Sequence, residues 1–226
     1  MVELQYFGHS FFKIVGKSGT MIIDPIFDSS KTSFEKFGKI PIKKESVGNI
    51  DLILLTNDME DHFDKIAVEE LAIKHNATVI AHDSILTSLD IPRNQKTSVF
   101  QANEIFLNGF KIKPVIAHCP QSFCPTGFLI DSDGKKIYHA GVTMLLETFA
   151  GIKTDVAILP LSSRSMDVVD VVRAAKMIKP KFLVPMQYDI FEKVRLDPID
   201  LKKRISESVL LTETLVLTPG KKMKIK

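Results

Sequence analysis

The most informative segment of this chain is Thr56-Asn57-Asp58-Met59-Glu60-Asp61-His62. It follows an apolar run at 51–55 that is typical of a buried strand, and it precedes a helical pattern. Its closing Asp61-His62 pair offers a carboxylate and an imidazole, both of which are ligands of divalent metal ions. The stretch therefore places potential metal ligands at a strand-to-helix junction.

The patterns on either side of this motif alternate between strands and helices. A capping residue, Asp64, precedes the first expected helix, and Pro198 opens the last one. The expected helices are 64–74, 168–178 and 198–206. The expected strands are 4–7, 11–15, 21–24, 51–56, 77–81, 110–117, 127–130, 136–139, 155–159, 182–186, 209–211 and 215–217. Two comparable halves of this kind suit an α/β (α+β) fold in which two sheets pack face to face with helices outside, an αββα sandwich, although periodicity alone leaves other α/β layouts open.

Composition bounds the class of protein. With 226 residues, 45% of them hydrophobic, the chain can bury a sizeable core, and we expect a single domain over 1–226. Its 30 basic residues are spread over many segments, which disfavours nucleic-acid binding. Two cysteines, no long apolar run and no charged-then-apolar leader predict a cytoplasmic protein without structural disulfides or membrane contact.

Short motifs along the chain resemble, in order, the landmarks of one family. Besides residues 56–62, they are Tyr6-Phe7-Gly8-His9-Ser10, Ile22-Ile23-Asp24-Pro25, Ala117-His118, Gly127-Phe128, Tyr138-His139-Ala140-Gly141-Val142-Thr143 and Pro185-Met186-Gln187-Tyr188. The chain is thereby identified as a member of the metallo-β-lactamase superfamily, in the branch that includes L-ascorbate-6-phosphate lactonase and metal-dependent hydrolases of bacteria and archaea. The resemblance covers nearly the full length and implies the four-layer αββα sandwich.

The resemblance also implies a two-metal centre. One ion is held by the first two histidines of the motif and a later histidine, and the other by the Asp-His pair, a bridging Asp and a last histidine. At these positions the chain keeps Asp61, His62 and His118. The other ligand positions carry different residues, Asn57, Met59, Val142 and Gln187.

These replacements leave each half of the implied centre short of ligands, since catalytic zinc generally has three protein ligands and an open position. Asn57 offers only a weak amide oxygen, and the thioether of Met59 suits Cu(I) better than Zn²⁺ or Mn²⁺. Val142 offers no ligand, but it removes a carboxylate that would repel its neighbour if no cation lay between them. We therefore expect a cavity repacked to stand without a metal, and no cofactor.

The alternative is one weakly bound zinc or manganese ion on the retained ligands Asp61, His62 and His118. A structural interpretation stands beside it. Carboxylates before a helix favour its positive end and cap its N–H groups, so the acidic residues of 58–64 need no metal. His62 and His118 can likewise be hydrogen-bonded structural histidines.

Several further residues are expected to line the cavity. They are His9, Asn57, Met59, Val142, Arg164, Gln187 and Tyr188. Arg164 has the planar donor group that binds phosphate or carboxylate, so an anion is the first candidate ligand. The polar stretch 26–48 is expected to be a functional loop bordering the site.

The two cysteines suggest a thiol nucleophile or further metal ligands. Adjacent residues on a strand point to opposite faces, so His118 and Cys119 cannot both face the cavity. That leaves Cys124 as the candidate, with inert buried thiols as the preferred interpretation.

Three functions are consistent with these features. The leading expectation is a hydrolase homologue that has lost its metal and its catalysis, a pseudoenzyme that binds a small anionic ligand or a protein partner and can form a homo-oligomer. The alternative is a metal-dependent hydrolase of an ester, lactone or phosphoester that uses a residual mononuclear site. Nucleic-acid processing ranks third, because nucleases of this superfamily resemble longer chains.

Overall fold

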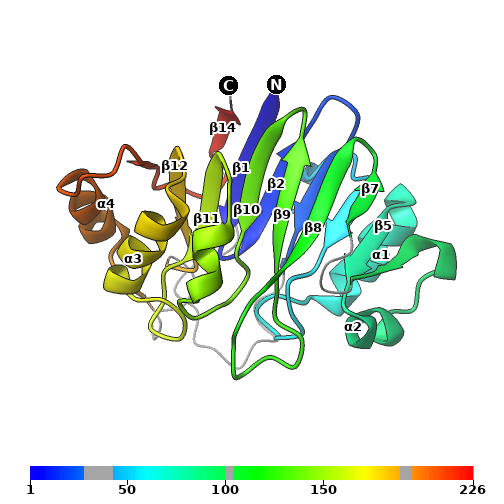
Figure 1. Ribbon diagram of the computed structural model, residues 1–226. Helices are drawn as coiled ribbons and strands as arrows, with labels where there is room; N and C mark the ends of the chain where they lie inside the picture. Colours follow the sequence, from blue (N-terminus) through cyan, green and yellow to red (C-terminus); the bar gives the residue numbers. More distant parts are fainter. Residues whose placement is uncertain (28–42, 100–103, 189–194, 226) are drawn as a thin grey trace.

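Two seven-stranded sheets pack face to face, and helices cover their outer faces (Figure 1). The computed structural model describes residues 1–27, 43–99, 104–188 and 195–225. Most of the loop expected at 26–48 lies outside the described residues. The arrangement is the αββα sandwich that the sequence predicted.

The first sheet has the order β14-β1-β2-β3-β4-β5-β6. Neighbours in the β14-β1-β2-β3 part are antiparallel, whereas β3 to β6 run parallel. Its strands are β1 (Val2–Gly8), β2 (Phe11–Val15), β3 (Thr20–Ile23), β4 (Leu52–Leu54), β5 (Thr78–Ala81), β6 (Lys96–Ser98) and β14 (Lys222–Ile225). Two helices lie on its outer face, α1 (Lys65–His75) and α2 (Asp83–Ser88).

The second sheet has the order β13-β12-β11-β10-β9-β8-β7. Its strands are β7 (Ile105–Leu107), β8 (Phe110–Ile116), β9 (Thr126–Ser132), β10 (Lys135–His139), β11 (Val156–Pro160), β12 (Phe182–Met186) and β13 (Glu213–Thr214). Its outer face is covered by α3 (Val168–Ile178) and α4 (Pro198–Ser206). Short 3-10 turns lie at η2 (Lys44–Ser46), η3 (Arg93–Gln95) and η4 (Glu147–Gly151).

Three apolar layers hold these elements together. The central layer joins the inner faces of both sheets and includes Leu4, Leu52 and Phe128. A second layer packs α1 and α2 on the first sheet, and a third packs α3 and α4 on the second. Burial of this apolar surface is the main force that holds the layers together.

The helix boundaries follow local capping. The side chain of Asp64 accepts a hydrogen bond from the Ala67 N–H at 3.1 Å at the start of α1, as the sequence predicted. Asp167 and Asp197 cap α3 and α4 in the same way. No helix within the described ranges is both long and apolar enough to cross a membrane.

Two predicted strands near the carboxyl end are wrong. The segments 209–211 and 215–217 are not strands, and the strands there are β13 and β14. Val209 and Leu211 are apolar but fully exposed, so their hydrophobicity did not mark a buried strand. The prediction also missed α2, which is too short for a helical period to show.

One turn near the site has no room for a side chain. Gly141 follows β10 with a φ of +63°, and a Cβ there would lie 2.9 Å from the Thr126 carbonyl oxygen and 3.0 Å from the Thr56 Cβ. Gly134, in the β9–β10 hairpin, has a similar φ of +74°, but among the described residues nothing lies within 4 Å of the position that a Cβ would take there. The two glycines share the same backbone strain and differ in available space.

We expect Gly141→Ala to lower the free energy of unfolding by roughly 3 kcal/mol, because left-handed strain and overpacking add. Gly134→Ala should cost about 1 kcal/mol, from the backbone strain alone. Urea unfolding of both variants measures this difference. Equal losses would show that the neighbours of Gly141 move aside without cost.

Candidate metal centre

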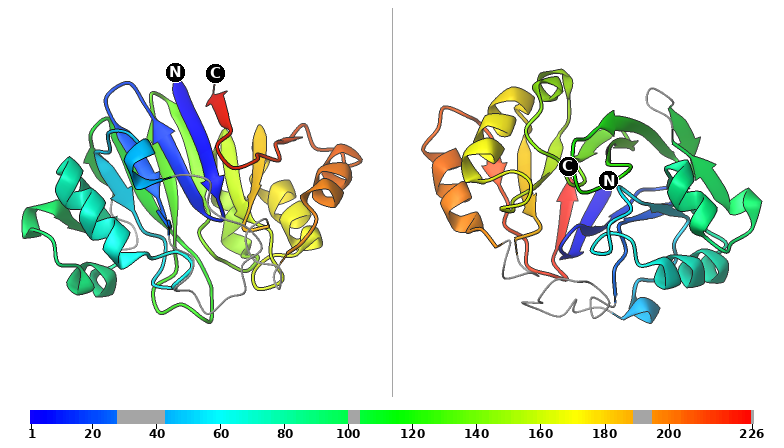
Figure 2. Two further views of the ribbon diagram at one scale, coloured as in Figure 1. Left: turned by 180° about the vertical axis from the view of Figure 1, so that it is seen from behind. Right: turned by 90° about the horizontal axis from the view of Figure 1, so that it is seen from below.

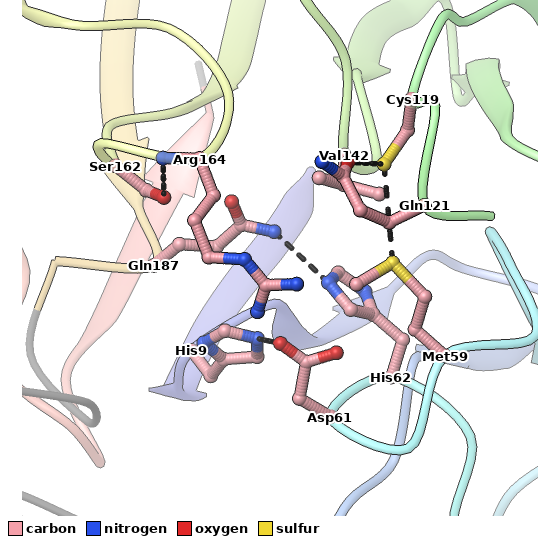
Figure 3. A pocket seen from close by; sticks show the side chains of 10 residues that line it. All are labelled: His9, Met59, Asp61, His62, Cys119, Gln121, Val142, Ser162, Arg164 and Gln187. Atoms are coloured by element: carbon pink, nitrogen blue, oxygen red, sulfur yellow. Dashed lines mark hydrogen bonds and ion pairs between the residues drawn. The ribbon is translucent and has the colours of Figure 1, made fainter. Parts of the chain in front are cut away.

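The loops that follow several strands meet at one edge of the sandwich (Figure 2). Side chains of these loops line a small cavity. Its volume is ≈ 20 Å³, which is room for about one water molecule or an ion. Binding sites commonly lie beyond the carboxyl ends of strands. The cavity is lined by His9, Met59, Asp61, His62, Cys119, Gln121, Val142, Ser162, Arg164 and Gln187 (Figure 3).

Three buried side chains form a group of potential metal ligands. One ligand atom each from His9, Asp61 and His62 lies within 4.8 Å of the other two. His9 Nε2 is 3.4 Å from Asp61 Oδ2, and the rings of His9 and His62 have centroids 5.0 Å apart. The second oxygen, Asp61 Oδ1, is buried and has no hydrogen-bond partner within the described part of the chain. Such an oxygen is suited to binding a cation.

Asp24 fixes the ring of His62 from behind. Its Oδ2 accepts a hydrogen bond from His62 Nδ1 at 2.7 Å and from the Thr56 hydroxyl at 2.5 Å, and its Oδ1 accepts from the Thr56 N–H at 2.8 Å. The Ser10 hydroxyl lies 3.0 Å from the same ring nitrogen. Because a carboxylate only accepts, Nδ1 carries a proton, and Nε2 is the ring nitrogen that faces the cavity.

Gln187 contacts that nitrogen. The nitrogen of its side-chain amide lies 3.0 Å from His62 Nε2 (Figure 3), which is a hydrogen-bond distance. The backbone N–H of Gln187 donates to the His9 carbonyl at 3.0 Å. This bond ties the end of β12 to the turn after β1, and it thereby joins the two sheets at the cavity.

Backbone strain gathers around the cavity. His9, Asp24 and Gln187 all have left-handed φ values, of 53°, 46° and 69°. Other non-glycine residues with positive φ lie at helix ends or hairpin turns, such as Asn76 after α1 and Asp133 before Gly134. Strain of this kind in residues other than glycine is concentrated at functional sites.

The charges in the cavity are strongly coupled. Burial raises the pKa of Asp61, but the nearby His62, His9 and Arg164 outweigh this and hold it well below its usual range. Burial lowers the pKa of His62, but Asp61 and the hydrogen bond to Asp24 outweigh this and raise it above its usual value. The carboxylate therefore stays ionised, which is the form that binds a metal.

The sequence predicted only part of the cavity lining. Five residues that were expected to line the cavity do line it in the structure, namely His9, Met59, Val142, Arg164 and Gln187. Asn57 and Tyr188 are buried elsewhere. The side-chain amide of Asn57 donates a hydrogen bond to Thr56 Oγ1 and accepts one from the Met59 N–H. The Tyr188 hydroxyl donates to the Leu217 carbonyl at 2.6 Å.

His118 is not brought together with Asp61 and His62. Its side chain is exposed, and the adjacent Cys119 is buried and lines the cavity instead. Buried positions along β8 are even-numbered up to Pro114 and odd-numbered from Ala117 onward, so the alternation changes phase where the strand ends. That one-residue shift exchanges the faces of His118 and Cys119.

Cys124 lies elsewhere as well. It lines a separate cavity of ≈ 520 Å³ and accepts a hydrogen bond from the Ser84 hydroxyl at 3.5 Å. Burial raises the pKa of its thiol, which is the property of an inert cysteine. The cavity residues that the sequence reasoning missed are Cys119, Gln121 and Ser162, and only the phase change after Pro114 could have indicated the first of them.

Comparison with known proteins identifies the family. A family model described as "Beta-lactamase superfamily domain" matches residues 3–187. The chain belongs to this superfamily, and its fold is the metallo-β-lactamase fold.

Relatives that match over the full length are named for metal-dependent hydrolysis. A UPF0173 metal-dependent hydrolase of Sulfolobus acidocaldarius is 30% identical over 237 residues, and one of Sulfurisphaera tokodaii is 28% identical, each with 100% of both chains covered. Among solved structures, Igni18, a metallo hydrolase of Ignicoccus hospitalis, superposes with a TM-score of 0.83 at 27% identity, covering 100% of this chain and 99% of that one. An isothiocyanate hydrolase from Delia radicum gut bacteria shares the fold, with a TM-score of 0.77, 15% identity and 99% of both chains covered.

The expectation of no cofactor is wrong. The relatives are named metal-dependent hydrolases, and the structure gathers the metal-ligand set His9, Asp61 and His62 in one buried group. Sequence reasoning weighed Asp61 and His62 with His118 and did not pair them with His9, which lies 52 residues before Asp61 in the chain. Neither the comparisons nor this group supports a protein that has lost its ligands and its catalysis.

A neutral histidine stands beside the site. His139 is fully buried, its Nε2 lies 3.2 Å from the Ser10 carbonyl, and its Nδ1 accepts from the Gly141 N–H at 3.2 Å. Burial lowers its pKa to about 4. Between about pH 6.5 and pH 4 the unfolded chain takes up a proton at this residue that the folded chain does not.

Because of His139 alone, we expect the free energy of unfolding to decrease by up to roughly 3 kcal/mol as the pH is lowered from about 6.5 to about 4. His139→Asn keeps an acceptor near the position of Nδ1 and removes this titration. Urea unfolding between pH 4 and pH 7.5 should therefore give a flatter curve for the variant. Parallel curves for the two proteins would contradict the assignment.

Proposed function

We propose that this chain is a metal-dependent hydrolase that binds one divalent ion through His9, Asp61 and His62. The observation that carries the proposal is the buried group of two imidazoles and one carboxylate around a cavity the size of an ion. Two histidines and one carboxylate form a ligand set that catalytic zinc uses, with a fourth position left open. When bound, such an ion acts as a Lewis acid and supplies activated water for hydrolysis.

The spacing of His9 and Asp61 fits a shared ion. Two ligand atoms each ~2.1 Å from a tetrahedral ion lie about 3.4 Å apart. His9 Nε2 and Asp61 Oδ2 are separated by 3.4 Å. The bond from His62 Nδ1 to Asp24 supports the same role, because metal-binding histidines donate their other N–H to a carboxylate.

The residues around the ligands have separate tasks. Asp24 orients the His62 ring and sets its tautomer, as described above. Gln187 contacts Nε2 of that ring at 3.0 Å and places a polar amide on the cavity wall, where it would contact a bound substrate. Val142 and Met59 exclude water from the rest of the cavity wall.

Arg164 supports an anionic substrate, an ester, lactone or phosphoester that carries a phosphate or carboxylate group. Its guanidinium points into the cavity near His9 and Gln187 (Figure 3), and its charge reaches both Asp61 and His62. A planar guanidinium recognises phosphate and carboxylate oxygens through paired hydrogen bonds. The backbone N–H of Arg164 donates a hydrogen bond to the Ser162 hydroxyl at 3.1 Å, and this bond holds the loop after β11 in place.

The purified protein should bind about one equivalent of Zn²⁺, measured by mass spectrometry for metal content and by calorimetric titration. Asp61→Asn and His9→Ala should each weaken binding by more than the ~10- to 100-fold that loss of an outer partner costs. His118→Ala is the matched control, because it removes an exposed histidine outside the cavity. A chelator should also lower the melting temperature of the wild type.

The control decides between two ligand sets. If His118→Ala lost zinc and His9→Ala retained it, the third ligand would be His118 and not His9. Zinc affinity that is the same in the wild type, Asp61→Asn and His9→Ala would overturn the proposed centre.

Arg164→Met should weaken binding of inorganic phosphate to the zinc-loaded protein by roughly 10- to 100-fold, since hydrogen bonds to charged groups contribute about 1.5–3 kcal/mol. The phosphate affinity of Arg164→Lys should lie between those of the wild type and Arg164→Met. Arg173→Met, on the exposed surface of α3, makes the same charge change far from the cavity and serves as the control. Equal phosphate affinity for all four proteins in calorimetry would remove Arg164 from substrate binding.

A further inference from the structure

Two sulfur atoms face each other on the cavity wall away from Arg164 (Figure 3). Cys119 Sγ lies 3.9 Å from Met59 Sδ and 3.2 Å from Gln121 Oε1. The Cys119 side chain is buried, with 5% of its surface exposed, and both sulfur residues line the cavity that holds His9, Asp61 and His62. None of the roles proposed above uses this pair as ligands.

The backbone holds both sulfur residues in place. The Met59 N–H donates to Asn57 Oδ1 at 2.9 Å, and the Met59 carbonyl accepts from the His62 and Phe63 N–H groups at 2.9 and 2.8 Å. On the other side, the Cys119 carbonyl accepts from the Ser122 N–H at 3.1 Å. The thioether and the thiol are therefore held close together by two separate loops.

The spacing of the two sulfur atoms matches a shared ion. Two sulfur ligands each ~2.3 Å from a tetrahedral ion lie about 3.8 Å apart. Thiolate and thioether ligands favour soft ions such as Cu(I), and they bind Mn²⁺ poorly.

We propose that Met59 Sδ and Cys119 Sγ form a soft-metal subsite that binds Cu(I), with Gln121 Oε1 beside it as an oxygen donor. On binding, the thiol of Cys119 releases its proton to solvent, and the thiolate becomes the ligand. The ligand atoms of the subsite are distinct from those of His9, Asp61 and His62, so it does not depend on an ion in the proposed hydrolytic centre. The cavity has room for about one ion, so the nitrogen and oxygen ligands on one side and the sulfur ligands on the other would select different metals, one at a time.

The test is a titration of the full-length protein with Cu(I) against a chromophoric Cu(I) chelator, without oxygen. Cys119→Ser should weaken Cu(I) binding by roughly 100-fold, and Met59→Leu, which conserves volume, by roughly tenfold. Cys124→Ser removes the other buried thiol and should bind Cu(I) as the wild type does. Unchanged thermal melting of each variant confirms that it is folded.

Two outcomes would overturn the subsite. One is equal Cu(I) affinity in the wild type and Cys119→Ser, which would make Cys119 a packed thiol only. The other is loss of binding in Cys124→Ser with retention in Cys119→Ser. Asp61→Asn separates this inference from the proposed function, because it should lose zinc and keep Cu(I), whereas Cys119→Ser should keep zinc and lose Cu(I).

Discussion

The buried carboxylate of Asp24 is the interaction on which the site depends. It lies at the end of β3, where it accepts two hydrogen bonds from Thr56 and one from His62 Nδ1. A buried carboxylate without such partners would be strongly unfavourable, so the strand end, the motif after β4 and the orientation of His62 are fixed together. The left-handed backbone of Asp24 is tolerated because these bonds hold it in place.

The cavity also requires that the two sheets stay in register at their common edge. Several hydrogen bonds cross between them there, among them those from the Gln187 N–H to the His9 carbonyl, from the Thr126 N–H to the Thr56 carbonyl, and between His139 Nε2 and the Ser10 carbonyl. Each joins the first sheet or one of its loops to the second sheet or one of its loops. The metal-ligand group comes from the first sheet, and the residues that face it, such as Arg164 and Gln187, come from the second. The site therefore exists only where the two halves of the chain pack.

The fold could be predicted from the sequence because its elements carry local signals. Alternating strands and Asp-capped helices such as α1 and α3 are visible in short windows. The site was predicted less completely, because its contacts are long-range. No pattern near His9 announces that it meets Asp61, and the exchange of His118 for Cys119 depends on a one-residue change of phase where β8 ends. The apolar residues Val209 and Leu211 led to the prediction of a strand that does not form, since hydrophobicity does not by itself require burial.

Charge balance connects the two sides of the cavity. Two carboxylates, Asp61 and Asp24, and one guanidinium, Arg164, lie in or directly behind the cavity, so negative charges outnumber positive ones by one when both imidazoles are neutral. A divalent cation would add two positive charges, and Val142, which lines the cavity, contributes no charge to offset them. Net charge is unfavourable in a buried cavity unless it is paired. A bound ion would thus strengthen the attraction of the cavity for an anionic substrate, with Arg164 positioned to receive its oxygens.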